Sequence, residues 1–109
     1  MKLFSVNGKD YQLKMTTANC VSCEKRLGKN PLNVFMEAQD NKMPRITDLM
    51  IILHESMLKF SHGIKLEEVF DLYDKYCEEG GDIMSLIELL VSVFQEAGFI
   101  PKDEEEVKN

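Results

Sequence analysis

The sequence has too few basic residues to indicate a nucleic-acid partner. It contains 13 lysines and arginines against 19 aspartates and glutamates, and its formal net charge is -6. Affinity for nucleic acids depends mainly on clustered Lys and Arg that neutralise phosphates. Part of the negative charge forms one continuous run, Asp103–Glu106. We therefore expect no nucleic-acid partner.

A long hydrophobic run is also missing. The most continuous one, Leu49–Leu53, is far shorter than the roughly 20 apolar residues that a membrane-spanning helix needs. No apolar stretch of signal-peptide length follows Met1. We therefore expect a cytoplasmic protein that does not contact a membrane.

The three cysteines do not form the pattern of a disulfide framework or of a metal site. Cys20 and Cys23 have the spacing of a redox motif or of half a zinc site. A thioredoxin-like site needs a βαβ framework, however, and structural zinc needs four ligands. Cys77, His54 and His62 show no paired spacing that would complete such a set. The sequence therefore predicts reduced thiols, no metal and no cofactor.

Motifs for catalysis and for calcium binding are lacking too. His54 is followed directly by Glu55, but adjacent residues on a helix point in different directions and do not form a dyad. The acidic stretch Asp71–Asp82 fails the calcium-loop template, because Tyr73 and Lys75 occupy ligand positions. There is no glycine-rich phosphate loop, no serine elbow and no tryptophan. We expect no catalytic residues.

What is present is the composition of one folded domain. Hydrophobic residues make up 44% of the 109 residues and charged residues 29%. A chain of this length buries roughly two-thirds of its unfolded surface, which is enough for a single core. We expect this domain over residues 1–100, with an acidic tail over residues 101–109.

The first 15 residues predict a β-hairpin. Lys2–Val6 and Lys9–Met15 alternate in polarity around Asn7-Gly8, the pair that best fits a two-residue type I′ turn. In that register Phe4 lies opposite Tyr11, and the apolar side chains share one face. An isolated two-stranded sheet is marginal in water, so a helix or another subunit must cover it.

Residues 16–98 predict about five helices, so the expected fold is mainly α, a compact bundle with an N-terminal β-hairpin. Each helix has recognisable start and stop signals, such as a capping Thr, Asn-Pro or Asp at its start and a glycine or polar run after its end. The expected helices are Thr16 or Thr17 to Leu27, a short one from Pro31 to the polar stop at Gln39–Lys42, Pro44 to about Ser61, Leu66–Tyr76 and Ile83–Ala97.

Two of these helices differ in what their apolar surface predicts. Leu49–Leu53 leaves no polar side, so the third helix is expected in the core, with Thr47, Asp48, His54, Glu55 and Lys59 facing water on either side of the run. The last helix has only a narrow polar stripe and more apolar surface than a peripheral helix needs, which indicates a protein partner or self-association. The predicted partner or subunit contacts are Met84, Leu90, Val91 and Phe94 on this helix, with Phe4 and Tyr11 on the hairpin.

One long segment resembles a known protein family. Residues 43–99, MPRITDLMIILHESMLKFSHGIKLEEVFDLYDKYCEEGGDIMSLIELLVSVFQEAGF, resemble the tail assembly chaperones of long-tailed bacteriophages and prophages of Gram-positive bacteria. The NGK hairpin and CEKRLGKNPLNVF, which is similar to the E-x-x-LGKNPL stretch of that family, extend the likeness over residues 1–100. The likeness rests on the order and spacing of these segments, because none of them contains a catalytic or ligand-binding motif.

The resemblance implies a non-enzymatic protein that binds the tape measure protein, keeps it soluble and helps to recruit tail tube protein. It also implies action in the cytoplasm of the bacterial host, absence from the mature virion, and likeness to the shorter of two forms made by frameshifting. Binding in many copies along one client favours a homo-oligomer, either ring or spiral. Two alternatives stay open: a small helical adaptor or regulatory module that binds an unrelated helix, and an enzyme or metal site built on Cys20, Cys23 and Cys77.

Overall fold

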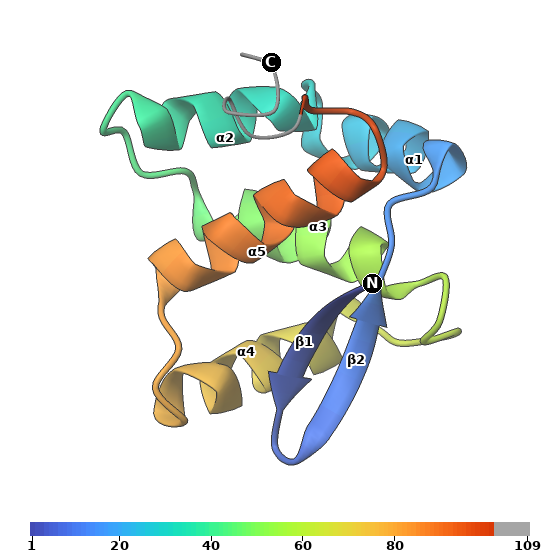
Figure 1. The fold of residues 1–109 in the computed structure, drawn as a ribbon, viewed down its shortest axis with the longest axis vertical. Helices are drawn as coiled ribbons and strands as arrows, with labels where there is room; N and C mark the ends of the chain where they lie inside the picture. The colour runs from blue at the N-terminus through green and yellow to red at the C-terminus, as the bar shows by residue number, and fades with distance from the viewer. Residues whose placement is uncertain (102–109) are drawn as a thin grey trace, which may run out of the picture.

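The computed structural model describes residues 1–101, which fold into a β-hairpin followed by a bundle of helices (Figure 1). This is the mainly α fold with an N-terminal hairpin that the sequence predicts. The expected tail lies, except for Pro101, outside the described residues. The elements are β1 (Lys2–Val6), β2 (Lys9–Leu13), α1 (Thr17–Leu27), α2 (Pro31–Gln39), α3 (Ile46–Met57), α4 (Leu66–Glu78) and α5 (Ile83–Glu96).

The hairpin has the predicted turn and register. Phe4 pairs with Tyr11, and Asn7 and Gly8 have φ angles of 54° and 75°, as a type I′ turn requires. Its apolar face is buried, except that Tyr11 is half-buried. The second strand ends two residues earlier than expected, because the N–H of Lys14 donates to the carbonyl of Ser56 in α3 rather than to β1. The buried members of this face are Phe4, Val6, Leu13 and Met15.

The predicted caps begin three of the helices. The Thr16 side chain accepts from the N–H of Asn19, and the Asn30 side chain accepts from the N–H of Leu32, just after Pro31. Asp82 and Ser85 cap α5 reciprocally, with side-chain to backbone distances of 2.8 and 3.1 Å. These signals are local, and local geometry is enough to satisfy them.

The third helix is shorter than the predicted Pro44–Ser61. It begins at Ile46, because Arg45 is still extended and serves as the N-cap residue. It ends at Met57, after which the chain turns back so that the Ile64 carbonyl lies 2.7 Å from His54 Nε2. The fourth helix runs two residues beyond the predicted end at Tyr76.

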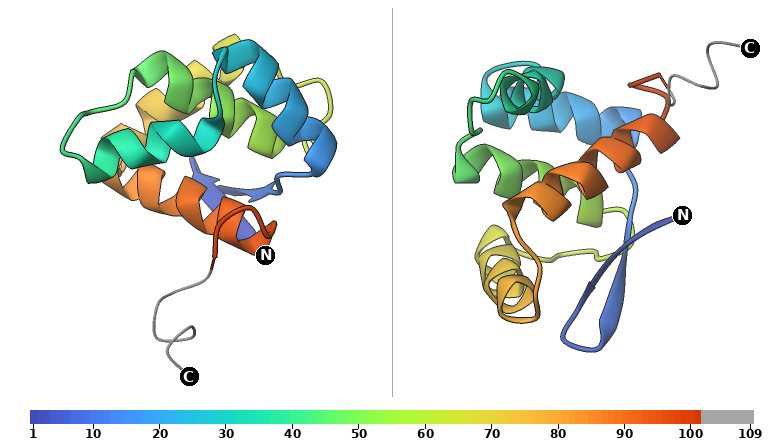
Figure 2. Two further views of the ribbon diagram at one scale, coloured as in Figure 1. Left: turned by 90° about the horizontal axis from the view of Figure 1, so that it is seen from above. Right: turned by 60° about the vertical axis from the view of Figure 1, so that its left-hand side comes forward.

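The third helix occupies the centre of the bundle, as expected of a core helix. Helices α1 and α2 lie on one side of it, α4 on the opposite side and α5 across it (Figure 2). Its buried apolar residues are Leu49, Met50, Ile52, Leu53 and Met57. Among the described residues, no helix is both long enough and apolar enough to cross a membrane.

The expectation that Asp48 and Glu55 face water was wrong. Asp48 has 0% and Glu55 has 2% of its surface exposed, and Ser56 is buried beside them. Burying a charge is costly unless partners satisfy it, and both carboxylates have such partners on neighbouring elements. The polar flanks of α3 are therefore interior contacts with the helices and loops that cover them, whereas Thr47 and Lys59 are exposed as predicted.

Candidate partner-binding groove

An apolar groove of about 650 Å³ lies between α2, α5 and the segment that follows α5. Its lining is almost entirely hydrophobic, with two glutamines as its polar members. Helix α2 contributes Leu32, Phe35, Met36, Ala38 and Gln39; α5 contributes Met84, Ile87, Val91 and Gln95; the following segment contributes Phe99, Ile100 and Pro101.

The walls of this groove are held together by aromatic packing. The Phe94 side chain is fully buried and packs edge-on against the Phe35 ring, with 5.2 Å between ring centroids. On its other side the Phe99 ring lies 6.1 Å away. Phe94 therefore links α5 to α2 and to the segment that follows α5. The distance between these three parts of the groove wall is set by packing contacts of the hydrophobic core.

The segment after α5 is positioned by the end of that helix. Gly98 has a φ of 88°, a conformation that glycine adopts without strain, and its N–H donates to the carbonyl of Gln95. The N–H of Phe99 donates to the Phe94 carbonyl at 2.9 Å. These bonds turn the chain back over α5, so that Phe99 closes one end of the groove.

Two methionines give the groove its exposed apolar surface. Met36 on α2 is 57% exposed and Met84 on α5 is 50% exposed. An unbranched thioether adapts its shape to different apolar partners, and it is common on binding surfaces for that reason. The groove therefore offers flexible apolar contacts on both of its sides.

The six residues predicted as partner contacts do not lie together. Met84 and Val91 line the groove, whereas Leu90 and Phe94 are fully buried inside the monomer, as is Phe4 on the hairpin. The physical reason is the helical repeat: Leu86, Leu90 and Phe94 recur every four residues on the buried face of α5, and Met84, Ile87 and Val91 recur on the face that lines the groove. The prediction for Leu90, Phe94 and Phe4 as surface contacts is therefore corrected.

Sequence reasoning missed the α2 side of the groove and its closing segment. Met36 and Phe99 carry no signal that places them beside α5, because a pattern within one helix does not reveal its neighbour. On α5 itself a signal was available, since Met84, Ile87 and Val91 recur at spacings of three and four residues, which is one face of a helix.

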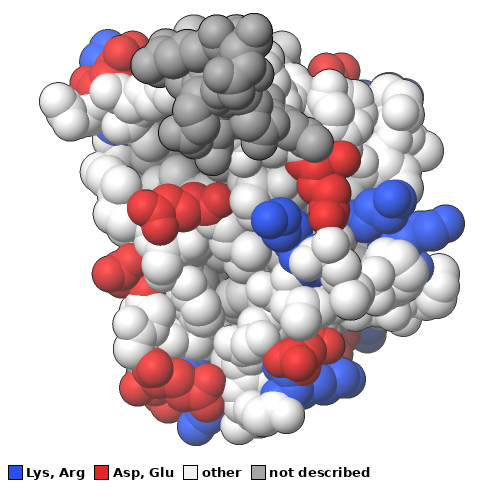
Figure 3. Space-filling view, viewed as in Figure 1, with Lys and Arg blue, Asp and Glu red and all other residues white. Residues whose placement is uncertain are grey.

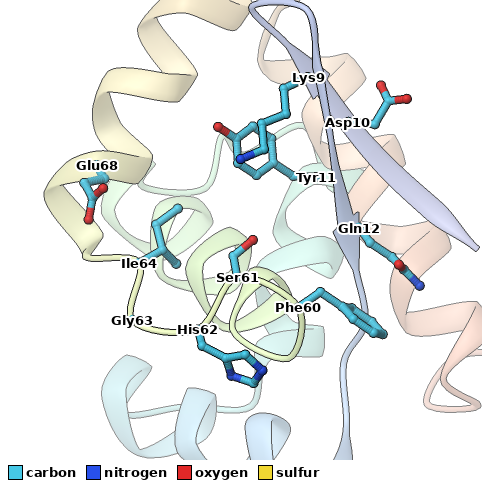
Figure 4. A pocket seen from close by; sticks show the side chains of 10 residues that line it. All are labelled: Lys9, Asp10, Tyr11, Gln12, Phe60, Ser61, His62, Gly63, Ile64 and Glu68. Carbon is cyan, nitrogen blue, oxygen red and sulfur yellow. The ribbon is translucent and has the colours of Figure 1, made fainter.

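Tyr11, the sixth predicted residue, lines a different and more polar pocket of about 690 Å³ between β2, the α3–α4 loop and α4. In Figure 4 the side chains of Lys9 and Tyr11 point into this pocket, whereas Asp10 and Gln12 point away from it. The Lys9 Nζ lies 4.8 Å from the Tyr11 ring centroid, a cation–π contact. Lys9 and Tyr11 therefore contact each other within the monomer. This pocket shares no lining residue with the apolar groove, so Tyr11 does not belong to the groove.

The cysteines have environments that disfavour reactivity at two of the three positions. Burial raises the pKa of Cys20, with a smaller contribution from Glu24. Burial, followed by the charge of Glu55, raises the pKa of the Cys23 thiol to about 12. A thiol is a weak nucleophile and metal ligand until it ionises. Cys77 is exposed, and no cluster of three or more His, Cys, Asp or Glu side chains within residues 1–101 could hold a metal ion.

His54 and Glu55 contact different elements. The Nε2 atom of His54 lies 2.7 Å from the Ile64 carbonyl, which can only accept, so Nε2 is the donor of this bond. The Nδ1 atom is buried and has no hydrogen-bond partner among the described residues. The Glu55 carboxylate instead binds α1, through Asn19 Nδ2 at 3.0 Å, Ser22 Oγ at 2.7 Å and Arg26 Nη1 at 2.8 Å. The two side chains thus hold α3 to its neighbours on separate sides.

Both buried carboxylates are stabilised in their charged forms. Burial acts to raise the pKa of Glu55, but the hydrogen bonds from Arg26, Ser22 and Asn19 outweigh it, so the pKa lies below its usual range. Asp48 behaves alike: burial acts to raise its pKa, and the bonds from Arg45 and Lys29 lower it overall. The Glu55 and Asp48 carboxylates therefore hold α3 to the elements around it, and neither is placed as a general base.

A spacing signal for the Glu55 contacts was present in the sequence. Asn19, Ser22 and Arg26 are three and four residues apart and therefore share one face of α1. From the sequence alone, a polar helix face of this kind is expected to be exposed to solvent. No feature of the α1 sequence indicates that a carboxylate from α3 covers this face.

Comparison with known proteins identifies a family whose function is not known. The profile of a family described as being of unknown function, DUF6096, matches residues 2–109. No curated protein and no solved structure matches the chain.

Proposed function

The chain belongs to a family of unknown function, DUF6096, and we propose that it acts as a non-enzymatic phage tail assembly chaperone. In this proposal the protein binds the tape measure protein, keeps it soluble and helps to recruit tail tube subunits during tail morphogenesis. The resemblance of residues 1–100 to such chaperones supplies the biological setting. The apolar groove between α2 and α5 is the structural observation that carries the proposal.

The groove suits a helical client. An amphipathic helix binds by placing apolar side chains, spaced three and four residues apart, into an apolar groove. Met36 and Met84 line such a groove from its two sides, and the buried Phe94 packs against the Phe35 and Phe99 rings, which are part of the lining. Binding of this kind covers the apolar stripe of the client and so prevents aggregation without any catalytic step.

Several copies must act together to cover a long client. A head-to-tail arrangement of identical subunits follows an elongated partner, either as a spiral or as a closed ring. We therefore include self-association in the proposal, with assembly in the host cytoplasm before the tail is complete.

Coexpression with a phage tape measure protein tests the proposal. We expect the wild-type chain to increase the soluble fraction of the tape measure protein, and Met36→Asp and Met84→Asp each to abolish the increase, because binding would bury an unpaired carboxylate against apolar side chains. Met43→Asp is the matched control, since Met43 is 61% exposed in the α2–α3 connection and does not line the groove.

Circular dichroism and urea unfolding should show that all three variants remain folded. Equal solubilisation by the wild type and both groove variants would contradict the proposal. A pull-down that returns no tail protein would favour instead an adaptor that binds an unrelated helix. A tail tube gene before this gene, a tape measure gene after it and a slippery sequence near its stop codon are the expected genomic setting.

A further inference from the structure

We propose that the outer edge of β2 pairs with the same edge of a second copy of this chain, so that two hairpins form one four-stranded antiparallel sheet. In Figure 1, α4 and α5 lie on the β1 side of the hairpin, and both contact β1, so that β2 is the outer strand. The inference goes beyond the proposed function and does not rest on it, because the groove between α2 and α5 takes no part in this contact.

The backbone groups of Asp10 and Gln12 point out of the hairpin. The two-residue turn joins the Val6 carbonyl to the Lys9 N–H, and hydrogen-bonded and non-hydrogen-bonded pairs alternate along the two strands from there. Asp10 and Gln12 therefore occupy positions that are not bonded to β1. Within residues 1–101, no hydrogen bond to another element engages their N–H or C=O groups. The outer edge of β2 thus offers two donors and two acceptors to another strand.

This edge is short. The next N–H that points outward, that of Lys14, donates to the Ser56 carbonyl of α3 at 2.9 Å and is not available. Along β2, the N–H groups open to an added strand are therefore those of Asp10 and Gln12.

These groups select one register for two antiparallel copies. Asp10 opposite Gln12 of the second copy forms two hydrogen bonds, and the two-fold axis repeats them, which gives four. Asp10 opposite Asp10 would bring like charges together, which is destabilising. Gln12 opposite Gln12 would place Asp10 against Lys14, whose N–H is already used. The register that pairs Asp10 with Gln12 is therefore favoured.

The side chains on the solvent face are complementary in this register. Asp10 lies opposite Gln12 and diagonal to Lys14 of the second copy, so an amide and an ammonium group are within its reach. Asp10 and Lys14 are both exposed in the monomer. Around the hairpin, acidic and basic side chains lie next to each other rather than in separate patches (Figure 3). A surface that carries both signs can pair with a copy of itself, whereas a surface of one sign repels its copy.

On the other face, the pairing brings two Tyr11 side chains together. Tyr11 lies on the two-fold axis as a non-hydrogen-bonded pair, the position at which cross-strand side chains are closest. In the monomer it is half-buried and points into the pocket of about 690 Å³ between β2 and the α3–α4 loop (Figure 4). Phe60 lines the same pocket and is 46% exposed. A second Tyr11 therefore adds aromatic cover to the side of the hairpin that one copy leaves open.

Sedimentation velocity of the full-length protein tests the inference. Because the edge is short, we expect a weak dimer with a Kd of about 10–100 μM. Gln12→Pro removes one N–H donor from each copy at an edge position, where proline is tolerated, and should raise the Kd about tenfold or more. Gln12→Ala is the matched control, since it keeps the N–H, and it should dimerise nearly as well as the wild type.

A cysteine on the two-fold axis locates the contact. In the proposed register the two Tyr11 Cα atoms are about 4.5 Å apart, which is within the range that a disulfide bridges. Tyr11→Cys should therefore form a covalent dimer with oxidised glutathione as the oxidant. The background is Cys77→Ser, because Cys77 is exposed. Ser5→Cys in the same background is the control, since Ser5 is exposed on β1, away from the shared edge, and it should not cross-link.

A protein that stays monomeric well above the expected Kd, or a dimer that Gln12→Pro leaves intact, would overturn the inference. Equal losses with Gln12→Pro and Gln12→Ala would overturn it too, as would cross-linking of Ser5→Cys as readily as Tyr11→Cys. If circular dichroism shows that Gln12→Pro does not fold, the two cysteine variants decide. A tape measure protein that stays insoluble on coexpression would contradict the proposed function alone, because these measurements use the protein without a client.

Discussion

The Glu55 carboxylate lies in the interior, and its donors Asn19, Ser22 and Arg26 all come from α1. Asp48, two helical turns earlier on α3, is bound by Lys29 and Arg45 in the same manner. A buried carboxylate is tolerated when every partner is present, and becomes costly when one is removed. At the scale of single residues, therefore, these two carboxylates determine how tightly α3 is held by the elements that cover it.

Truncating Glu55 should destabilise the protein strongly. We expect Glu55→Ala to lower the free energy of unfolding by about 3 kcal/mol, because Asn19, Ser22 and Arg26 lose their acceptor and a cavity remains. Urea unfolding followed by circular dichroism measures this. Glu88→Ala is the control, since Glu88 is exposed on α5, and its effect should stay within about 0.5 kcal/mol. Similar losses for the two variants would contradict the role given to Glu55.

The same carboxylates predict a loss of stability in acid. The pKa of Glu55 is lowered from 4.5 and that of Asp48 from 3.8, so near these values the unfolded chain binds more protons than the folded one. Their contribution is fully present above the unfolded pKa values and is lost as the pH falls through the folded ones. The urea midpoint of the wild type should therefore fall below about pH 4.5.

Glu55→Gln isolates one of the two contributions. The amide cannot ionise, so the gap in unfolding free energy between wild type and variant should be largest above about pH 5 and narrow as the pH falls. A gap that stays constant between about pH 6 and pH 3 would show that Glu55 does not titrate with folding.

At the scale of elements, α5 has two apolar faces with different uses. Leu86, Leu90 and Phe94 are fully or almost fully buried in the core. Met84 and Val91 line the groove on the other side. The surplus apolar surface that the sequence indicates on this helix is therefore real at Met84, but smaller than predicted, because the fold buries two of its four predicted contact residues.

The start of α5 depends on Asp82. Its Oδ1 accepts from the N–H of Ser85 at 2.8 Å, and the Ser85 hydroxyl accepts from the N–H of Asp82. We expect Asp82→Ala to cost about 1 kcal/mol of unfolding free energy, whereas Asp82→Asn, which keeps an accepting oxygen, should cost much less. Urea midpoints at neutral pH measure both. Equal losses would indicate that the charge of Asp82, rather than its hydrogen bond, matters.

At the scale of the whole molecule, hairpin and helices share one core. The Phe4 ring lies 5.0 Å from the Tyr76 ring of α4, and Phe4 belongs to the same buried cluster as Phe94 of α5. The sequence leaves unspecified which helix covers the hairpin, and three helices contact it: α4 and α5 contact β1, and α3 contacts β2.

A shared core predicts one cooperative unfolding transition. The three tyrosines, Tyr11, Tyr73 and Tyr76, lie on the hairpin and α4, and there is no tryptophan. Tyrosine fluorescence therefore reports one side of the molecule, while far-ultraviolet circular dichroism reports all helices. We expect the two urea transitions to coincide. A tyrosine transition at lower urea would show that the hairpin and α4 unfold separately.

The sequence alone determined the elements of this fold. The Asn7-Gly8 turn, the caps Thr16, Asn30 and Asp82, and the apolar run Leu49–Leu53 each act within a few residues, so their consequences can be read without knowing the neighbours. Some helix and strand ends differ from the prediction, and they differ where a contact with another segment takes over. An example is the end of α3, after which the chain turns back and the Ile64 carbonyl contacts His54.

Only the tertiary structure decided what lies between those elements. Glu55 meets donors 29 to 36 positions away in the chain, and the groove joins α2 to α5 across the whole central part of the sequence. The periodicity of α5 places Leu90 and Val91 on different faces, but it does not show which of these faces the rest of the fold buries. The reason is physical: burial and concave surface are properties of two or more packed elements, whereas capping, turns and amphipathic spacing are properties of one.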